Sequence, residues 1–288
     1  MIAALFGGTF DPPHTGHEMI VDEAIKALHV EKIFIVPTYL NPFKSEFYIP
    51  ADLRLKWLNI LFKDEKKVEV LDFEVKQKRA VATIETVKYL LKNYDIEKLY
   101  LIIGADNYAK LHKWSRYKEL KTLVEFVIAS RDGIITSKEL KKIKINVNIS
   151  SSELREELNL SFIPNSIKSE VEEFYKTRKE MEKRIENIVK ILDEKKAENI
   201  QSFDMSDKDY FVDSVVIATT LGERHGLALL DHLKGELKSQ GEHFLNIDES
   251  EDWVILDMGD ILVHLMSPDY RARYNIEEFL SSYKSPEN

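Results

Sequence analysis

The sequence predicts an α/β protein of two domains: a parallel sheet covered by helices, followed by a smaller mixed α/β domain. In residues 1–150, short apolar runs of β-type residues alternate with segments whose apolar residues recur every three or four positions. Such alternation is typical of parallel strands joined by crossover helices. The length of 288 residues fits one large domain or two ordinary ones. Because the charge also divides the chain, we expect domains at residues 1–180 and 181–288.

The two expected domains differ in charge. Residues 1–180 hold 29 Lys and Arg against 27 Asp and Glu, a net charge of +2, whereas residues 181–288 hold 12 against 23, a net charge of −11. A strongly acidic domain repels a phosphate backbone, so we expect no direct DNA binding. An acidic surface is instead complementary to a basic protein.

The composition also restricts the compartment and the chemistry. The chain has no cysteine, which excludes disulfides, thiolate metal sites and cysteine nucleophiles, and fits a reducing cytosol. The first residues lack the basic flank of a signal peptide, and no apolar run approaches the roughly 20 residues of a membrane span. We therefore expect a cytoplasmic protein with no membrane partner.

In the first domain, the expected strands are residues 2–6, 32–36, 68–72, 98–103, 125–129 and 144–149, and the expected helices are 16–28, 52–62 and 83–91. Ligands of a parallel sheet bind at the carboxyl ends of its strands, so functional residues should follow strands. Residues 166–196 are helical in pattern and contain neither Gly nor Pro. We expect two helices there, with a break near residues 177–182, because thirty residues is long for a globular helix.

In the second domain, the expected strands are residues 200–205, 213–220, 253–258 and 261–266, and the expected helices are 225–238 and 276–282. The last two strands are separated by Gly259 and Asp260, which is a two-residue hairpin signal with glycine first.

The most specific pattern is the string GGTFDPPHTGH at residues 7–17, between the first strand and the first helix. Gly7 and Gly8 let the backbone approach a ligand, and the helix start presents unpaired N–H groups that favour phosphate. His14 and His17 lie three residues apart and can direct two donors at one anion. One histidine alone would be an ordinary structural residue. The whole string indicates a phosphate site, although it is neither a Walker A loop nor a dinucleotide fingerprint.

This string resembles the signature of the nucleotidyltransferase superfamily, which joins a nucleoside triphosphate to a phosphorylated acceptor. Further segments are similar to bacterial nicotinate mononucleotide adenylyltransferases: NPFK at 41–44, TIETV at 83–87, IGADN at 103–107, LHKW at 111–114 and ISSSELR at 149–155. Their order and spacing cover residues 1 to about 175. The resemblance implies a Rossmann-like fold for the first domain.

The resemblance also implies a reaction and a set of site residues. The 5′-phosphate of nicotinate mononucleotide would attack the α-phosphorus of ATP and release pyrophosphate, with His14 and His17 as the catalytic pair. The implied ATP-binding residues are Gly7, Gly8, Thr9, Phe10, His14, His17, Gly104, Asp106, Ser150, Ser151 and Arg155. The implied acceptor-binding residues are Lys44, Thr83 and Trp114. Mg²⁺ would arrive with ATP, held by phosphate oxygens and water and not by a dedicated protein site.

Some of these residues have a simpler explanation. Ser150 and Glu153 fit a helix capping box, which accounts for both without any ligand. Capping does not account for Arg155, which follows on the same helix and can reach a phosphate.

The second domain has no glycine-rich phosphate loop. The string DWVILDMGDILVH at 252–264, with SVVIATT at 214–220 and RYNIE at 273–277, resembles the ribosomal silencing factors, or Iojap-like family. The resemblance implies a non-enzymatic module that binds a basic protein of the large ribosomal subunit and blocks subunit joining. Trp253, Asp257 and Asp260 are the candidates for the ribosome-facing surface.

Two alternatives stay open at this point. The enzyme could use another phosphorylated acceptor, such as phosphopantetheine, which the Trp114 and serine-rich segments disfavour. The protein could instead be a translation repressor with a degenerate enzyme half, which the intact His14, His17 and Arg155 disfavour.

Overall fold

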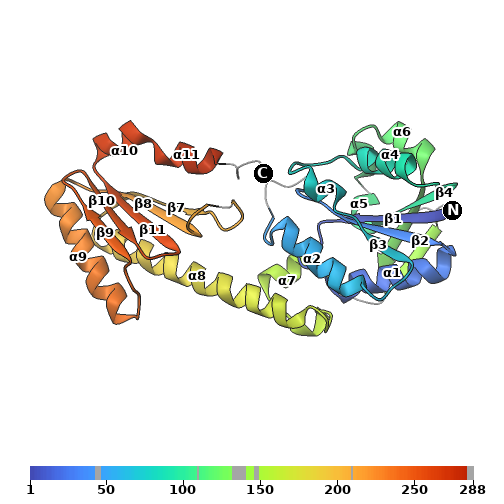
Figure 1. The fold of residues 1–288 in the computed structure, drawn as a ribbon, viewed down its shortest axis with the longest axis horizontal. Coiled ribbons are helices and arrows are strands. Elements are labelled where there is room, and N and C mark those ends of the chain that lie inside the picture. Colours follow the sequence, from blue (N-terminus) through green and yellow to red (C-terminus); the bar gives the residue numbers. More distant parts are fainter. Residues whose placement is uncertain (43–46, 109, 132–140, 146–148, 209, 284–288) are drawn as a thin grey trace. The chain divides into compact units, whose positions relative to one another are not determined.

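The computed structural model describes residues 1–42, 47–108, 110–131, 141–145, 149–208 and 210–283. It divides into two compact units, Met1–Tyr175 and Lys176–Asn288, each with its own sheet (Figure 1). The predicted α/β class, with a parallel sheet followed by a smaller mixed sheet, is confirmed.

The first unit is built on a six-stranded sheet in which every neighbouring pair is parallel. Its strands are β1 (Ile2–Gly8), β2 (Lys32–Pro37), β3 (Val68–Val70), β4 (Lys98–Gly104), β5 (Glu125–Arg131) and β6 (Lys141–Ile145). Their order, β3-β2-β1-β4-β5-β6, is that of a doubly wound Rossmann sheet. The chain adds β1 to β3 toward one edge of the sheet and β4 to β6 toward the other, so the strand order reverses between β1 and β4. A ligand crevice is expected outside the carboxyl ends of these two strands.

Helices cover both faces of this sheet. Alternate residues of β1 point to opposite faces, so Ala4 and Phe6 enter one core and Ala3 and Leu5 the other. The first core includes α1 (Thr15–Leu28) and α2 (Ala51–Phe62), and the second includes α4 (Thr83–Asn93) and α6 (Tyr117–Leu123). Burial on both faces explains why these strands are apolar throughout.

Shorter elements stand between the strands and the main helices of this unit: α3 (Phe73–Lys76), α5 (Ala105–Tyr108), α7 (Ser151–Glu156), and 3₁₀ turns at Leu111–Lys113 and Leu160–Phe162. The strand expected at residues 144–149 is wrong in position, because β6 begins at Lys141. Lysine and isoleucine alternate from Lys142 to Ile145, and Ile143 is buried in the sheet core. Residues 146–148 lie outside the described residues.

The expected break near residues 177–182 is also wrong. Helix α8 (Lys168–Glu194) runs through this segment as 27 continuous residues. It contains no Gly or Pro, and the ion pair Arg178–Glu182 spans one of its turns. Its first half buries Val171 and Tyr175 in a core of the first unit, and its second half buries Ile188 in the core of the second. Apolar burial at both ends therefore supports a helix of unusual length.

The second unit has a five-stranded mixed sheet in the order β7-β8-β11-β10-β9. Its elements are β7 (Glu198–Asp204), β8 (Ser214–Thr219), α9 (Glu223–Ser239), β9 (Asn246–Glu249), β10 (Trp253–Asp257), β11 (Ile261–Met266), α10 (Pro268–Tyr274) and α11 (Ile276–Ser282). β8 and β11 pair in parallel, and the other neighbours are antiparallel. The predicted hairpin is confirmed: Met258 N donates to Ile261 O at 2.9 Å, and Gly259 has a φ of +91° that favours glycine.

Two elements of this unit were not expected from the sequence. β9 is a short strand at the sheet edge, and its residues, mostly polar and exposed, show no apolar alternation. α10 does carry a readable signal, because Ser267 caps it by accepting from Tyr270 N and Pro268 occupies its first turn.

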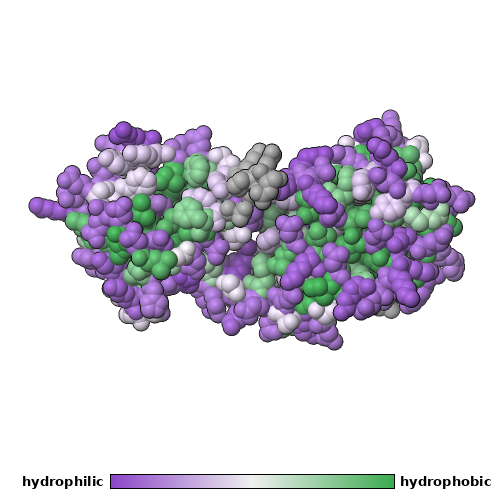
Figure 2. Space-filling model, viewed as in Figure 1, coloured by the Kyte–Doolittle hydropathy of each residue, from purple (hydrophilic) through white to green (hydrophobic). Residues whose placement is uncertain are grey.

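Hydrophilic side chains cover most of the surface visible in Figure 2, with smaller hydrophobic areas among them. Among the described residues, the large hydrophobic side chains that are exposed all belong to the second unit: Phe211, Leu221, Leu227, Leu245, Tyr274 and Phe279. Across the described part of the chain, no helix has the length and apolar character that crossing a bilayer requires.

The continuity of α8 can be tested at Glu180, an exposed residue in the middle of the helix. Proline inside a helix costs about 3 kcal/mol because it removes a backbone hydrogen bond and clashes with the preceding turn. We expect Glu180→Pro to lower helicity in circular dichroism and the melting temperature, and Glu180→Ala to change neither. Equal behaviour of the two variants would show that the helix is interrupted there.

Candidate active site

Two histidines form the start of α1, directly after the turn that follows β1. His14 is the N-cap residue, and its Nδ1 accepts a hydrogen bond from Gly16 N at 3.1 Å. His17 Nδ1 accepts from His14 N, also at 3.1 Å. The two rings stack with their centroids 3.7 Å apart. The histidines therefore hold each other through the helix cap, which explains their spacing of three.

This arrangement fixes which ring nitrogen carries the proton when either histidine is neutral. Because each Nδ1 accepts a backbone N–H, a neutral ring carries its proton on Nε2, which is then a donor suited to a phosphate oxygen. Burial, and then the charge of His14, hold the pKa of His17 well below its ordinary value of 6.5. His17 is therefore a neutral donor at pH 7.

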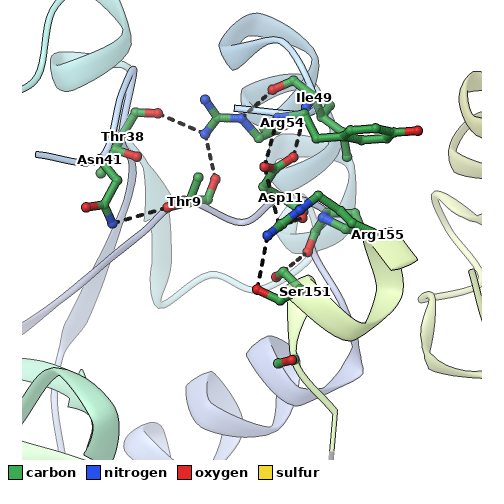
Figure 3. Close-up of polar contacts among 12 residues, drawn as sticks. Thr9, Asp11, Thr38, Asn41, Ile49, Arg54, Ser151 and Arg155 are labelled. Atoms are coloured by element: carbon green, nitrogen blue, oxygen red, sulfur yellow. Dashed lines mark hydrogen bonds and ion pairs between the residues drawn. The ribbon is translucent and has the colours of Figure 1, made fainter. Parts of the chain in front are cut away.

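Asp11 joins three segments that lie far apart in the sequence (Figure 3). Its buried carboxylate accepts from Ile49 N at 2.9 Å and from Tyr48 N at 3.1 Å. Arg155, on α7, donates to the Asp11 carbonyl at 2.7 Å and pairs with its carboxylate at 3.5 Å. Ser151 also donates to Pro12 O at 3.1 Å. The start of α7 is thereby fixed against the turn after β1.

Arg54 is a buried cation that the sequence analysis missed. Its guanidinium, on α2, donates to the carbonyls of Ile49, Thr9 and Thr38 (Figure 3). It also donates to the carbonyl of Tyr39. Burial lowers the pKa of Arg54 to about 10, while Asp11 opposes this shift, so the group stays charged at pH 7. A readable signal exists, because Arg54 falls at the buried helical spacing of Ala51, Trp57 and Leu58.

A cavity of about 230 Å³ opens at the carboxyl ends of β1 and β4. The predicted residues Gly7, Gly8, Thr83 and Trp114 all line it. The other polar residues of its wall, which were not predicted, are Thr38, Asn41, Glu74, Asn107, Lys113 and Ser115. The cavity therefore stands where the strand order predicts a ligand, and it joins the first string to the segments at 83–87 and 111–114.

Glu74, on α3, is the second buried ionisable residue that the sequence analysis missed. Its side chain is 5% exposed, and Thr86 Oγ1 of α4 donates to its Oε1. Burial raises the pKa of Glu74 to about 7, and the bond from Thr86 opposes this effect. Since Glu74 lies in a short helix of ordinary composition, periodicity alone could not single it out.

The other predicted residues of the phosphate string take structural positions beside the histidines. Thr9 Oγ1 accepts from Asn41 Nδ2 at 3.5 Å. The Phe10 ring is buried and meets the His17 ring edge-on at 4.8 Å between centroids. A Cβ on Gly8 would lie 3.1 Å from this ring, a tight contact that glycine avoids.

Of the remaining predicted residues of the first unit, one caps a helix, one ends a strand and two lie wholly or partly outside the described residues. Ser150 is the N-cap of α7: its Oγ accepts from Glu153 N at 3.2 Å while its own N donates to Glu153 at 2.7 Å, so the capping box forms. Gly104 ends β4. Lys44 and the side chain of Asp106 lie outside the described residues.

The three candidates of the second unit each have a contact within that unit. Trp253 Nε1 donates to His264 Nδ1 at 3.1 Å, and Asp257 accepts from Gly259 N at 2.8 Å inside the hairpin. Asp260 accepts from Arg184 at 3.0 Å. Their role in ribosome binding stays a prediction.

The fold and this site define the class of the protein: it is an enzyme of the nucleotidyltransferase class. Residues 5–157 match the family model described as cytidylyltransferase-like, and the chain belongs to that family. Residues 178–287 match a second family model, described as ribosomal silencing factor during starvation.

Curated relatives match the first unit over nearly their whole length. The chain is 54% identical over 173 residues to a probable nicotinate-nucleotide adenylyltransferase of Sulfurimonas denitrificans, covering 60% of this chain and 94% of the relative. A protein of the same name from Campylobacter jejuni is 48% identical over 175 residues, with 61% and 97% covered.

A solved structure shares the fold. It is the nicotinic acid mononucleotide adenylyltransferase of Plasmodium falciparum complexed with NaAD, at 21% identity and a TM-score of 0.50, with 60% of this chain and 95% of that chain covered.

The importance of the buried guanidinium can be tested with Arg54→Met. This change leaves four carbonyls without their donor, and we expect it to destabilise the first unit by about 3–5 kcal/mol, the usual cost of breaking a buried charged network. Lys56→Met, at an exposed position of the same helix, is the matched control and should change stability little. Similar melting curves for both variants would contradict the assignment.

Proposed function

We propose that the first unit transfers the adenylyl group of ATP to nicotinate mononucleotide, giving nicotinate adenine dinucleotide and pyrophosphate. The observation that carries the proposal is the 54% identity to a relative of this name over 94% of its length. The paired histidines and the cavity at the carboxyl ends of β1 and β4 support it, because they provide phosphate donors beside a space for an acceptor.

The proposed reaction is a direct displacement. An oxygen of the acceptor 5′-phosphate forms a bond to the α-phosphorus of ATP, and the bond from that phosphorus to the bridging oxygen breaks. The electron pair leaves with pyrophosphate, so no enzyme nucleophile is needed. The rings of His14 and His17 donate from Nε2 to the phosphate oxygens on which charge develops. Fixed positions and charge stabilisation then account for the rate.

The other proposed contacts follow the resemblance. Arg155 and the start of α7, with Ser150 and Ser151, bind the β- and γ-phosphates. The backbone of residues 7–10 and Gly104 contacts the nucleotides, and Asp106 holds a ribose hydroxyl. Lys44, Thr83 and Trp114 bind the acceptor, with the indole stacked on the pyridine ring. Asp11 and Arg54 act as positioning residues, because their hydrogen bonds hold the phosphate turn against the neighbouring segments of the site.

We expect Mg²⁺ to enter with ATP, where it would neutralise phosphate charge. Asp11 is the acidic side chain of the phosphate turn, and its carboxylate already accepts two backbone N–H groups and pairs with Arg155. In the described residues, no group of three or more His, Asp or Glu side chains is arranged to hold a metal. We propose that phosphate oxygens and water hold the ion, as is usual for Mg²⁺ bound with a nucleotide.

For the second unit we propose binding to the large ribosomal subunit through a basic ribosomal protein, which blocks subunit joining. The family match at residues 178–287 and the net charge of −11 over residues 181–288 support this. Trp253, Asp257 and Asp260 are proposed to face the ribosomal protein. Both proposed activities place the protein in the cytoplasm.

The proposed enzyme is tested by pyrophosphate release from ATP and Mg²⁺ with nicotinate mononucleotide, nicotinamide mononucleotide or phosphopantetheine. We expect the highest turnover with nicotinate mononucleotide. In the same assay His17→Ala should lower kcat by about 10²–10³, the usual effect of losing one charge-stabilising donor. His29→Asn, at an exposed histidine outside the site, should not. Near-normal turnover of folded His17→Ala would remove this residue from the site, and activity on another acceptor alone would replace the substrate.

The proposed binding is tested by sedimentation of the full chain with isolated ribosomal subunits. We expect it to migrate with large subunits and not with small ones, and the association to weaken as salt rises, because charge contributes to it. Joined ribosomes should form more slowly in its presence. No co-migration with large subunits would overturn the proposal without affecting the enzyme.

A further inference from the structure

Three buried polar atoms on the cavity wall lack a hydrogen-bond partner within the described part of the chain. They are Thr38 Oγ1, Glu74 Oε2 and Trp114 Nε1, and they come from three different segments. Buried polar atoms are almost always hydrogen-bonded, so three exceptions on the wall of one cavity mark where a bound ligand or water supplies the missing partners. The set comprises a hydroxyl, a carboxyl oxygen and an N–H donor, which is suited to a ligand with a polar group at one end.

Glu74 is the member of this set that can change its charge. Thr86 donates to Oε1, which holds the carboxyl in one orientation and leaves Oε2 as the oxygen without a protein partner. A protonated Oε2 is a donor, whereas an ionised one only accepts. The same atom can therefore form opposite hydrogen bonds with a carboxylate and with a carboxamide.

We propose that Glu74 selects the acceptor by the group on its pyridine ring: in its protonated form it donates to a carboxylate, and in its ionised form it repels a carboxylate and accepts from a carboxamide. The inference rests on the proposed function, since it concerns how that same site chooses between the acid and amide forms of one mononucleotide. The pyridinium charge and the 5′-phosphate are common to both acceptors and cancel in the comparison.

The protonation of Glu74 changes within the physiological range. Burial is the main cause that raises its pKa to about 7, Thr86 opposes the shift, and Glu85 adds to it. Below this pH the carboxyl is protonated and favours the acid acceptor. As pH rises through 7 the carboxyl ionises, so the preference for the acid acceptor should fall.

Most of the other charged groups around α3 have partners of their own. Glu85 of α4 pairs with Arg79 at 2.7 Å, and on α3 itself Lys76 pairs with Asp72 at 2.9 Å. The remaining charged groups on neighbouring elements are Lys32 of β2, paired with Glu69; Asp52, Arg54 and Lys56 of α2, of which Arg54 binds carbonyls and Lys56 pairs with Glu170; Lys88 of α4, paired with Glu119, and Lys92 of α4; and Lys113 on the cavity wall. Only Glu85 among these influences Glu74, so the change in preference can be assigned to Glu74.

The test compares kcat/KM for nicotinate and nicotinamide mononucleotides with the full chain between about pH 6 and about pH 8.5. In the wild type we expect the ratio of kcat/KM for nicotinate mononucleotide to kcat/KM for nicotinamide mononucleotide to fall as pH rises, with a midpoint near 7. The fall should be about tenfold or more, which is the effect of one hydrogen bond to a charged group. Glu74→Gln should keep the acid acceptor favoured at every pH, because its amide donates from the position of Oε2 while its oxygen accepts from Thr86. Glu119→Gln, at a half-buried carboxylate of α6 that pairs with Lys88, should retain the wild-type profile.

Thr86→Val provides a second variant that does not alter the carboxyl. It removes the donor that favours the ionised form, so the midpoint of the ratio should move to higher pH. If one acceptor binds without turnover, its inhibition constant replaces its kcat/KM. A flat ratio in the wild type, or an equal fall in Glu74→Gln, would overturn the inference and leave adenylyl transfer standing. Turnover of neither acceptor at any pH would instead overturn the proposed function.

Discussion

The site depends on one buried cation. The guanidinium of Arg54 satisfies four carbonyls in the turn after β1, the segment after β2 and the start of α2, so these three stretches of irregular backbone share one donor group. Backbone outside helices and strands lacks the regular hydrogen bonds that satisfy carbonyl groups, and a buried carbonyl without a donor is destabilising. A planar group with five donors meets this need in a way that lysine cannot. The geometry of the phosphate turn is therefore inseparable from α2.

Asp11 extends this constraint to the far end of the first unit. Its carboxylate accepts hydrogen bonds from two backbone N–H groups that precede α2. Arg155, more than 140 residues away in the sequence, donates to the Asp11 carbonyl. A ligand phosphate near Arg155 would therefore act on a side chain that is already oriented by two bonds to the chain. Orientation before binding reduces the conformational entropy that binding must overcome. The same contacts thus serve stability and recognition.

Much of the fold could be read from the sequence, because strands buried on both faces are apolar throughout and the hairpin glycine is unambiguous. The position of β6 and the continuity of α8 could not, since an edge strand and a charged helix are decided by tertiary burial of single residues such as Ile143 and Ile188. Motif strings found the residues that follow strands. They did not find Arg54, whose burial is visible only in its helical spacing, or Glu74, whose short helix carries no such signal.

The unbroken helix α8 has a consequence for how the protein can be divided. Domains are usually joined by exposed linkers that can be cut without loss, but here the junction between Tyr175 and Lys176 lies inside hydrogen-bonded backbone. A fragment that ends there would leave its last carbonyls without partners and would lose helical turns adjacent to Val171 and Tyr175, which its own core requires. Each isolated half therefore needs an overlapping piece of the same helix to fold as it does in the whole chain.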